Sequence, residues 1–218
     1  HYHRFEIPKK SGGRRLISAP RPRLKAAQRW ILDNLLSRLE LGEHAHGFRP
    51  GHSIVSGARP HVGADVVVNV DLKDFFPTVS YRRVRGLFRW MGYSEAVATI
   101  LALICTEPEI KEVDLDGDRY YVATSERFLP QGAPTSPALT NLICKRLDRR
   151  LAGACNKLGF VYTRYADDLS FSGASDAPVG QLLGQVHYIV EAEGFVVHPD
   201  KTRVFRNGRR KEVTGLVV

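Results

Sequence analysis

Alternating and helical spacings of apolar residues predict a chain that mixes short strands with helices. Polar and apolar positions alternate over residues 3–18 around Gly12-Gly13, which predicts a β-hairpin. Leucine and isoleucine then recur at helical spacing over residues 24–39. The run 66–70 is almost entirely valine, which favours one buried strand. The first third of the chain therefore predicts a hairpin, a helix and a core strand.

The rest of the chain continues the mixture. Ser80 and Ser94 can each cap a helix, and Ser136-Pro137 marks a further helix start. A helix near residues 179–193 ends at Gly194. The expected strands are 113–115 and 120–122 about an Asp116-Gly117 turn, 161–165, 169–172, 195–198, 201–206 and 213–218. This order predicts an α+β fold: a mostly antiparallel sheet with helices on one face, preceded by a basic hairpin module.

Charge is distributed unevenly along the chain. The net charge is +9, and residues 1–30 hold nine Lys or Arg against one acid. Residues 200–212 hold six basic side chains against two acidic ones, whereas residues 31–199 carry 17 basic and 20 acidic groups. Two basic flanks around a mildly acidic middle suit a polyanion gripped at the edges of a carboxylate-bearing site. Taken alone, this charge distribution is more typical of an ordinary solvated surface.

Composition excludes some classes of protein. No stretch approaches the ~18 consecutive apolar residues that cross a bilayer, and no signal-peptide pattern opens the chain. We therefore expect a cytoplasmic protein with no membrane association. The three cysteines form no C-x-x-C pair and fit buried thiols in a reducing compartment. Residues 42–63 contain five Gly, two Pro and four His, which predicts an irregular connector with a short helix. Its histidines lack cysteine partners, which favours structural or RNA-facing roles over zinc; they are His44, His46, His52 and His61.

Acidic residues stand at two places where strand propensity disfavours them. Asp71 ends the valine run, and Asp167-Asp168 lie at the tip of a tight hairpin. If these strands are neighbours, the carboxylates converge at one edge of the sheet and repel one another. Divalent cations neutralise such clusters, and oxygen ligands suit Mg²⁺. Two ions about 3.5–4 Å apart can activate a hydroxyl and stabilise leaving pyrophosphate. An Asp-Asp pair is also common in ordinary turns.

Several segments resemble the motifs of reverse transcriptases, in the same order along the chain. They are Ile7–Arg15, His46-Gly47-Phe48-Arg49, Asp71-Leu72-Lys73-Asp74-Phe75-Phe76-Pro77, Leu129–Pro137, Tyr165-Ala166-Asp167-Asp168, His198-Pro199-Asp200-Lys201-Thr202 and Val213–Val217. The resemblance implies a right-hand polymerase with a palm and with fingers that carry the N-terminal β-hairpin. Residues 1–64 would form the fingers and 65–212 the palm, with an intervening segment near 80–128. Residues 213–218 would begin the primer-grip strand, without the thumb.

The resemblance implies roles for the acidic residues and for one aromatic residue. Asp71, Asp167 and Asp168 would be the catalytic carboxylates. Together with Leu72 they would form the metal site for two Mg²⁺ ions, with Mn²⁺ as an alternative. The ring of Phe76 would exclude a ribonucleotide's 2′-hydroxyl and so favour dNTPs. As a single residue, Phe76 fits a core aromatic equally well.

Contacts to nucleotide and nucleic acid are implied in the same way. Lys9 and Arg15 would grip the triphosphate, and Arg suits phosphate through its bidentate fork. Gln131 would line the nucleotide pocket, and Lys201 would donate a proton to departing pyrophosphate. The RNA or primer contacts would be Arg14, Arg49, His61, Thr214 and Gly215. Taken singly, the two lysines are also typical of solvated surface charges.

Within this family, the closest resemblance is to retron enzymes. It rests on Ala133–Pro137, Tyr162–Asp168 and Val213-Thr214-Gly215, while Lys25–Trp30 and Val197–Thr202 resemble myxobacterial retron enzymes. The resemblance implies a structured noncoding RNA as template, dNTPs as substrates and an RNA–DNA hybrid as product, primed from an RNA 2′-hydroxyl. It also implies a role in anti-phage defence together with an effector protein.

Two departures from the retron pattern accompany this resemblance. Gly57-Ala58-Arg59-Pro60-His61 stands where retron enzymes usually carry Asn-Ala-x-x-His, and Pro60 disfavours a helix there. The thumb and the helical N-terminal extension are not found, which predicts a fragment of a longer enzyme. The alternatives are a group II intron-like or abortive-infection-type enzyme, or a catalytically retired RNA-binding scaffold. Intact Asp71, Asp167 and Asp168 argue against the scaffold.

Overall fold

The chain folds into two compact units. The computed structural model describes residues 1–8, 12–208 and 210–218. The first unit comprises residues 1–39 and 76–140, and the second comprises 40–75 and 141–218. Residues 40–64 contain the connector and were expected to belong to the fingers. They pack within the second unit.

The first unit begins with the expected antiparallel hairpin. Strand β1 (Tyr2–Pro8) pairs with β2 (Arg14–Pro20) over their whole length, so that Tyr2 lies opposite Pro20 and Pro8 opposite Arg14. The end of β2 turns inward, where the Ser18 N–H donates to the Gln131 carbonyl at 2.8 Å. The alternation over residues 3–18 correctly predicted this hairpin.

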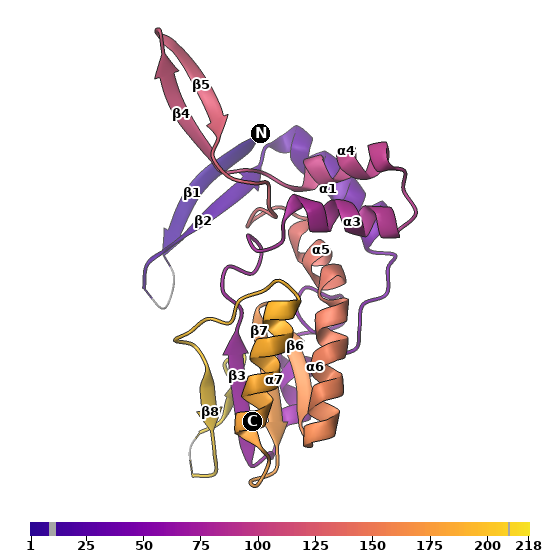
Figure 1. Cartoon of the computed structure of the whole chain (residues 1–218), viewed down its shortest axis with the longest axis vertical. Helices are drawn as coiled ribbons and strands as arrows, with labels where there is room; N and C mark the ends of the chain where they lie inside the picture. The colour runs from indigo at the N-terminus through magenta and orange to yellow at the C-terminus, as the bar shows by residue number, and fades with distance from the viewer. Residues whose placement is uncertain (9–11, 209) are drawn as a thin grey trace. The chain divides into compact units, whose positions relative to one another are not determined.

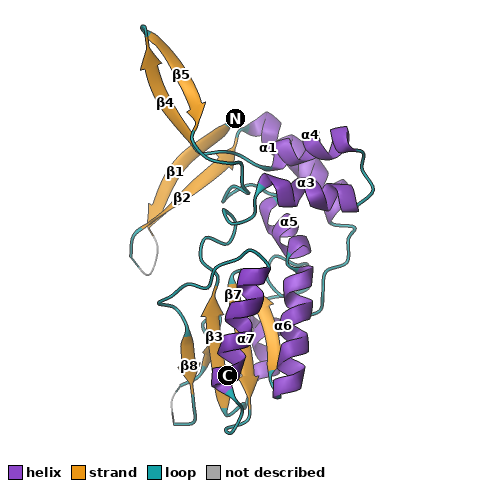
Figure 2. Ribbon diagram, viewed as in Figure 1, coloured by secondary structure: helices purple, strands orange, loops and turns teal. Residues whose placement is uncertain are grey.

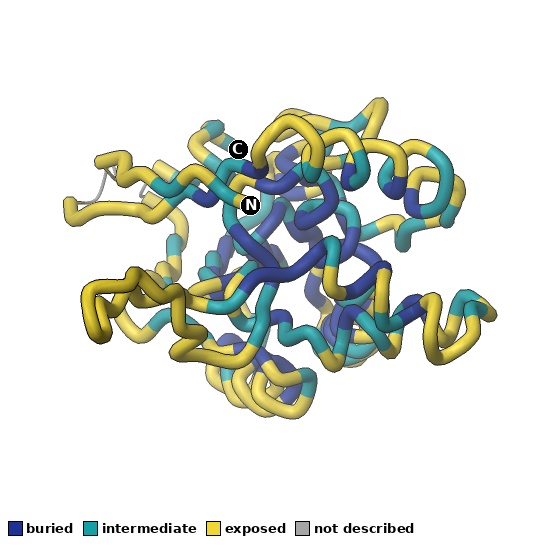
Figure 3. Tube along the Cα trace, turned by 90° about the horizontal axis from the view of Figure 1, so that it is seen from above, coloured by how far each residue is buried: buried dark blue, intermediate teal, exposed yellow. Residues whose placement is uncertain are grey.

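The first unit also contains several helices and a second hairpin (Figure 1). The helices include α1 (Pro22–Ile31), which continues as a π-helix over Leu32–Leu36, α3 (Tyr81–Trp90) and α4 (Glu95–Cys105). The Ser94 hydroxyl caps α4 by accepting from the Val97 N–H, whereas Ser80 precedes α3 without a side-chain capping bond. Strands β4 (Ile110–Leu115) and β5 (Asp118–Ala123) are exposed at every residue (Figure 3).

The second unit is built on a four-stranded antiparallel sheet, as the sequence predicted. Its strand order is β6 (Val161–Tyr165), β7 (Asp168–Gly173), β3 (Val66–Asp71) and β8 (Arg203–Phe205). Helices α6 (Lys145–Leu158) and α7 (Val179–Ala192) lie side by side over one face (Figures 1 and 2). Helix α5 (Ser136–Ile143) comes just before α6, and the two are separated at Cys144.

The opposite face of the sheet is also covered. Val67 is fully buried in a cluster with Ala58 of α2 (Ile54–Ala58) and Val213 of β9 (Glu212–Val213). The Asn69 amide donates to the Glu212 carbonyl at 2.7 Å. Because successive residues of a strand face opposite sides, burial on both faces explains why Val66–Val70 are all apolar except Asn69.

Two strand predictions were wrong. The stretch expected as one strand over residues 213–218 is a hairpin of β9 and β10 (Leu216–Val217). It turns at Thr214 and Gly215, whose φ angles are 48° and 82°, and such left-handed backbone cannot continue a strand. Residues 195–198 contribute only a single bridge, between Val197 and Leu72. No helix within the described residues combines the length and apolar character needed to cross a membrane.

Candidate active site

The structure brings the ends of β3 and β7 together with their acidic residues. Asp71 is the last residue of β3 and Asp168 the first of β7, and the two lie opposite each other in the antiparallel register. The Leu72 N–H donates to the carbonyl oxygen of Asp167 at 2.9 Å. The predicted convergence of three acidic residues at one sheet edge is therefore present in the backbone.

A tight turn presents two of these residues. Strands β6 and β7 are joined through Ala166 and Asp167, with Tyr165 opposite Asp168. Ala166 has a φ of 57°, a conformation that is uncommon for a residue other than glycine. Such backbone persists only where surrounding contacts hold it, and it is frequent at functional sites.

The electrostatics of the edge favour a cation. The pKa of Asp168 is raised to about 7, first by burial and then by the neighbouring carboxylates of Asp167 and Asp71, against the opposing effect of Lys201. The Lys201 ammonium lies 2.9 Å and 3.0 Å from the two carboxylate oxygens of Asp71. A side-chain cation therefore already balances part of the acidic charge.

The donor set fits a divalent ion in chemistry and in strand register. No group of three His, Cys, Asp or Glu side chains in the described part of the chain is arranged as a ready-made metal cluster. The carboxylates of Asp71, Asp167 and Asp168 are nevertheless the oxygen donors that Mg²⁺ prefers. The ion pair between Lys201 and Asp71 shows that a positive charge is stabilised beside them. Leu72 is buried and its N–H is engaged, so its main-chain carbonyl is the group that remains for a ligand role.

A buried ionic network supports the turn from beneath. Arg164 is fully buried, and its guanidinium binds both carboxylate oxygens of Asp148 at 2.7 Å and 2.8 Å. Its Nη1 donates to Asn141 Oδ1 at 2.9 Å and to the Ala166 carbonyl at 3.1 Å. The Tyr162 hydroxyl donates to Asp148 at 2.8 Å. Arg164 thus ties the strained residue of the turn to helices α5 and α6.

Gly47 packs directly against the same turn. A Cβ at this position would lie 2.5 Å from the Ala166 nitrogen, so no side chain fits there. The Asn141 amide donates to the Gly47 carbonyl at 2.8 Å, and this hydrogen bond holds Gly47 in place beside the turn. Gly47 lies in a recognised motif, but its contact with the turn was not predicted.

The expected nucleotide-binding residues are spread over both units. Lys201 lies at the carboxylate edge of the second unit, whereas Arg15, Phe76 and Gln131 belong to the first. Arg15 is exposed on β2, and Phe76 and Gln131 are half-buried. Lys9 lies outside the described residues. The nucleotide contacts of all five residues stay predictions.

The expected RNA or primer contacts occupy very different environments. Arg14 is exposed and pairs with Glu6 at 2.9 Å. Arg49 donates to the Gly42 carbonyl at 2.8 Å, so it also fastens the connector. Thr214 and Gly215 form the turn between β9 and β10. For these four residues an RNA or primer contact stays a prediction.

The RNA contact predicted for His61 is wrong, because its side chain is fully buried. Its Nε2 lies 2.8 Å from the Thr163 hydroxyl and its Nδ1 lies 2.7 Å from the Ser172 hydroxyl. The Thr163 hydroxyl gives its own proton to the Gly57 carbonyl at 3.0 Å, so Nε2 must carry the donated hydrogen. His61 therefore joins the connector to β6 and β7 through both of its ring nitrogens.

The burial of His61 predicts a specific loss of stability in acid. Burial lowers the pKa of His61 from 6.5 to about 4. The unfolded chain therefore binds this proton first, and stability falls as pH drops from 6.5 towards 4. We expect urea unfolding, followed by circular dichroism, to show a loss of about 2 kcal/mol between pH 7.5 and 5 from this residue. His61→Gln should lack that component, and equal pH slopes in both proteins would contradict the assignment.

Comparison with known proteins agrees with the motifs. The family described as "Reverse transcriptase (RNA-dependent DNA polymerase)" matches residues 7–217. All of the chain aligns with Retron Mx162 reverse transcriptase of Myxococcus xanthus at 53% identity, covering 47% of that protein. All of it also aligns with Retron Mx65 reverse transcriptase of the same organism at 50% identity, covering 51%. Retron Ec86 reverse transcriptase of Escherichia coli is 36% identical, again over the whole chain and over 63% of that protein.

Solved structures support the fold. Telomerase from Candida albicans, determined in complex with a TWJ fragment of telomeric RNA, superposes with a TM-score of 0.61 at 13% identity. The match covers all of this chain and 45% of that one, and at such low identity it shows the fold alone. The chain spans roughly half the length of the two Myxococcus relatives. The family model matches residues 7–217, and retron reverse transcriptases are similar to the chain over its entire length. The chain therefore belongs to the reverse transcriptase family.

Proposed function

We propose that the chain forms the fingers and palm of an RNA-directed DNA polymerase of the retron type. Its substrates are dNTPs, and its template is a structured noncoding RNA of which it copies a part into an RNA–DNA hybrid (multicopy single-stranded DNA). The enzyme acts in the cytoplasm, in anti-phage defence with an effector protein. The observation that carries the catalytic proposal is the register of Asp71 opposite Asp168, with Asp167 bound to Leu72.

The proposed chemistry assigns a task to each charged residue of the edge. Asp71 and Asp167 would hold two divalent ions, and the half-buried carboxyl group of Asp168 would support the site. Mg²⁺ bound there supplies Lewis-acid activation of the attacking hydroxyl and stabilises the leaving pyrophosphate. Lys201, which neutralises Asp71 in the ion-free protein, is then free to donate a proton to pyrophosphate.

Primer extension by the full-length protein tests the proposal. With poly(rA)/oligo(dT), Mg²⁺ and dTTP, we expect template-dependent incorporation of dTTP. RNA binding without incorporation would contradict the proposal and favour the retired scaffold. Incorporation that persists without a template would favour an abortive-infection-type enzyme. Sequencing the nucleic acid that copurifies with the native protein tests the retron assignment, which predicts one structured RNA joined to DNA.

Phe76 gives a prediction about nucleotide choice. Phe76→Ala should admit ribonucleotides, because its ring is proposed to occupy the space that a 2′-hydroxyl needs. We expect the dTTP/UTP ratio of kcat/KM to fall on the order of 100-fold, a size that one steric contact can supply. The matched control is Phe128→Ala, since Phe128 is another half-buried phenylalanine of the first unit. An unchanged ratio in Phe76→Ala would refute the assignment of this gate.

A further inference from the structure

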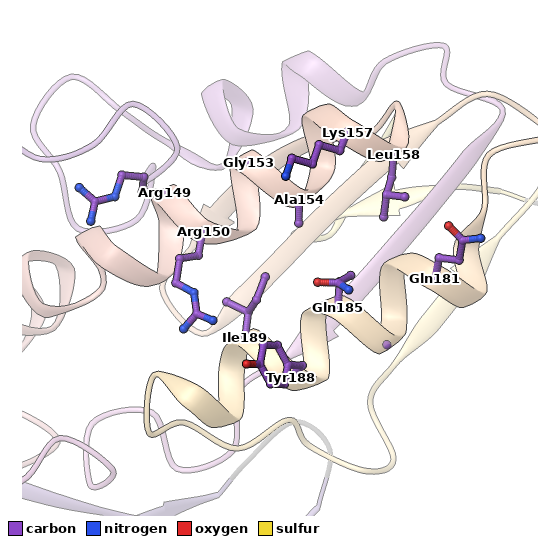
Figure 4. Close-up of a pocket in the computed structure, with 11 residues that line it drawn as sticks. Arg149, Arg150, Gly153, Ala154, Lys157, Leu158, Gln181, Gln185, Tyr188 and Ile189 are labelled. Atoms are coloured by element: carbon purple, nitrogen blue, oxygen red, sulfur yellow. The ribbon is translucent and has the colours of Figure 1, made fainter.

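A basic groove runs between helices α6 and α7, on the side of these helices that faces away from the sheet (Figure 4). Arg149, Gly153 and Lys157 follow one another at intervals of four residues and therefore share one face of α6. The wall on α7 includes the polar side chains of Gln181, Gln185 and Tyr188, together with Gly184 and Ile189.

The groove carries uncompensated positive charge. Arg149 and Lys157 are exposed, and neither forms an ion pair with any residue in the described part of the chain. Arg150 is held differently, at 2.6 Å from Glu193 and with its guanidinium 5.9 Å from the centre of the Tyr188 ring. Two free cations therefore line one wall, and the nearby acid is already neutralised.

Small residues line part of the groove and leave the backbones of both helices accessible there. Gly153 and Ala154 of α6 and Gly184 of α7 are among its lining residues. A Cβ built on either glycine would meet no other atom within 4 Å. Glycine costs about 1 kcal/mol relative to alanine inside a helix, so these positions lower helix stability while leaving space free. The space lies between the cations and the polar wall.

We propose that this groove binds the sugar–phosphate backbone of RNA, at a site separate from the carboxylate edge. Arg149 and Lys157 are eight residues apart, or about 12 Å along the helix. Cations at this separation can contact two phosphates of one strand that are not adjacent to each other. The amides and the hydroxyl of the α7 wall can both donate to and accept from ribose 2′-hydroxyls. The proposal rests on the proposed function, which requires a structured RNA partner.

A charge inserted into the open space tests the groove. Gly153→Glu in the full-length protein places a carboxylate between the two cations, and its Cβ would meet no atom within 4 Å. We expect the Kd for a 20-bp mixed-sequence RNA duplex, measured by fluorescence anisotropy in 0.1 M KCl, to rise about tenfold, or 1.4 kcal/mol. Gly86→Glu is the matched control, because Gly86 is exposed on α3 and its Cβ would also meet nothing within 4 Å. The control should change the Kd less than about twofold, as a surface substitution does.

The salt dependence of binding provides a second readout. Arg149→Gln combined with Lys157→Gln should reduce the slope of log Kd against log salt by up to about 2, because two phosphate contacts are lost. An unchanged Kd in Gly153→Glu, together with an unchanged slope in the double variant, would overturn the proposal. Extension of poly(rA)/oligo(dT) at saturating substrate distinguishes a failure of the proposed polymerase function from a failure of the proposed RNA-binding groove. Failure of the unmodified protein to extend this primer refutes the polymerase, whereas normal extension with unchanged duplex binding refutes only the groove.

Discussion

Asp167→Asn is expected to lower dTTP incorporation about 1,000-fold or more while the protein still folds and binds RNA. Removal of a single group that stabilises transition-state charge costs about 10²–10³ in rate, and loss of an ion with its ligand exceeds this. Asparagine keeps the volume of the side chain and removes its charge. The main-chain carbonyl of Asp167, which accepts from the Leu72 N–H, is untouched.

The matched control is Asp176→Asn. Asp176 is an exposed aspartate in the loop that follows β7, beyond the end of the strand opposite to the turn. Incorporation of dTTP, RNA affinity and the thermal midpoint are measured for the two variants and the unmodified protein. Incorporation by Asp167→Asn at more than a tenth of the normal rate would contradict its assignment as an ion ligand.

Gly47→Ala is expected to lower incorporation about 100-fold, although Gly47 bears no chemical group of its own. The added Cβ would lie 2.5 Å from the Ala166 nitrogen, so the turn must move. A displacement on the order of 1 Å at a catalytic group can cost about 100-fold in rate. The loss should appear mainly in kcat, because the carboxylates are displaced from the reacting atoms.

Gly42→Ala serves as the control for this change. Gly42 belongs to the same connector, its φ is not positive, and its Cβ would meet nothing within 4 Å. It should retain nearly normal incorporation. If Gly47→Ala had the same kcat as Gly42→Ala, the turn would tolerate displacement and the close packing would have no role in catalysis. A crystal structure of Gly47→Ala would show the displacement directly.

The sequence was informative wherever local patterns dominate. Alternation around Gly12-Gly13 fixed the first hairpin, and Asp116-Gly117 fixed the second. The valine run ending at Asp71 and the pair Asp167-Asp168 predicted two strand ends that carry acidic residues, and the structure places these ends opposite each other. These features depend on residues close together in the chain, where periodicity and turn chemistry are strong.

Long-range side-chain pairs were missed for a physical reason. The bond between Arg164 and Asp148 joins a strand to a helix, and no local pattern specifies such a partner. The available signal was a charged residue at a core position: Arg164 lies within the strand β6, and Asp148 shares the buried face of α6 with Leu151. Charges at such positions are almost always paired, so each predicts that a partner exists but not which one.

His61 illustrates the same limit. Its place in a polar, proline-containing connector was compatible with an exposed RNA contact, yet the imidazole is buried between β6 and β7 hydroxyls. The hairpin at Thr214 and Gly215 was missed because Thr214 adopts a left-handed φ that its residue type rarely takes. Tertiary contacts decide both conformations.

The location of bound Mn²⁺ tests the central assignment most directly. Crystals of the full-length protein with an RNA template, a DNA primer and dTTP can be soaked with Mn²⁺ and measured at its anomalous edge. We predict two peaks about 3.5–4 Å apart, bound by the carboxylates of Asp71 and Asp167 and by phosphate oxygens of dTTP. Ordered primer and dTTP with no anomalous peak at these two carboxylates would contradict the assignment of this edge as the polymerase site.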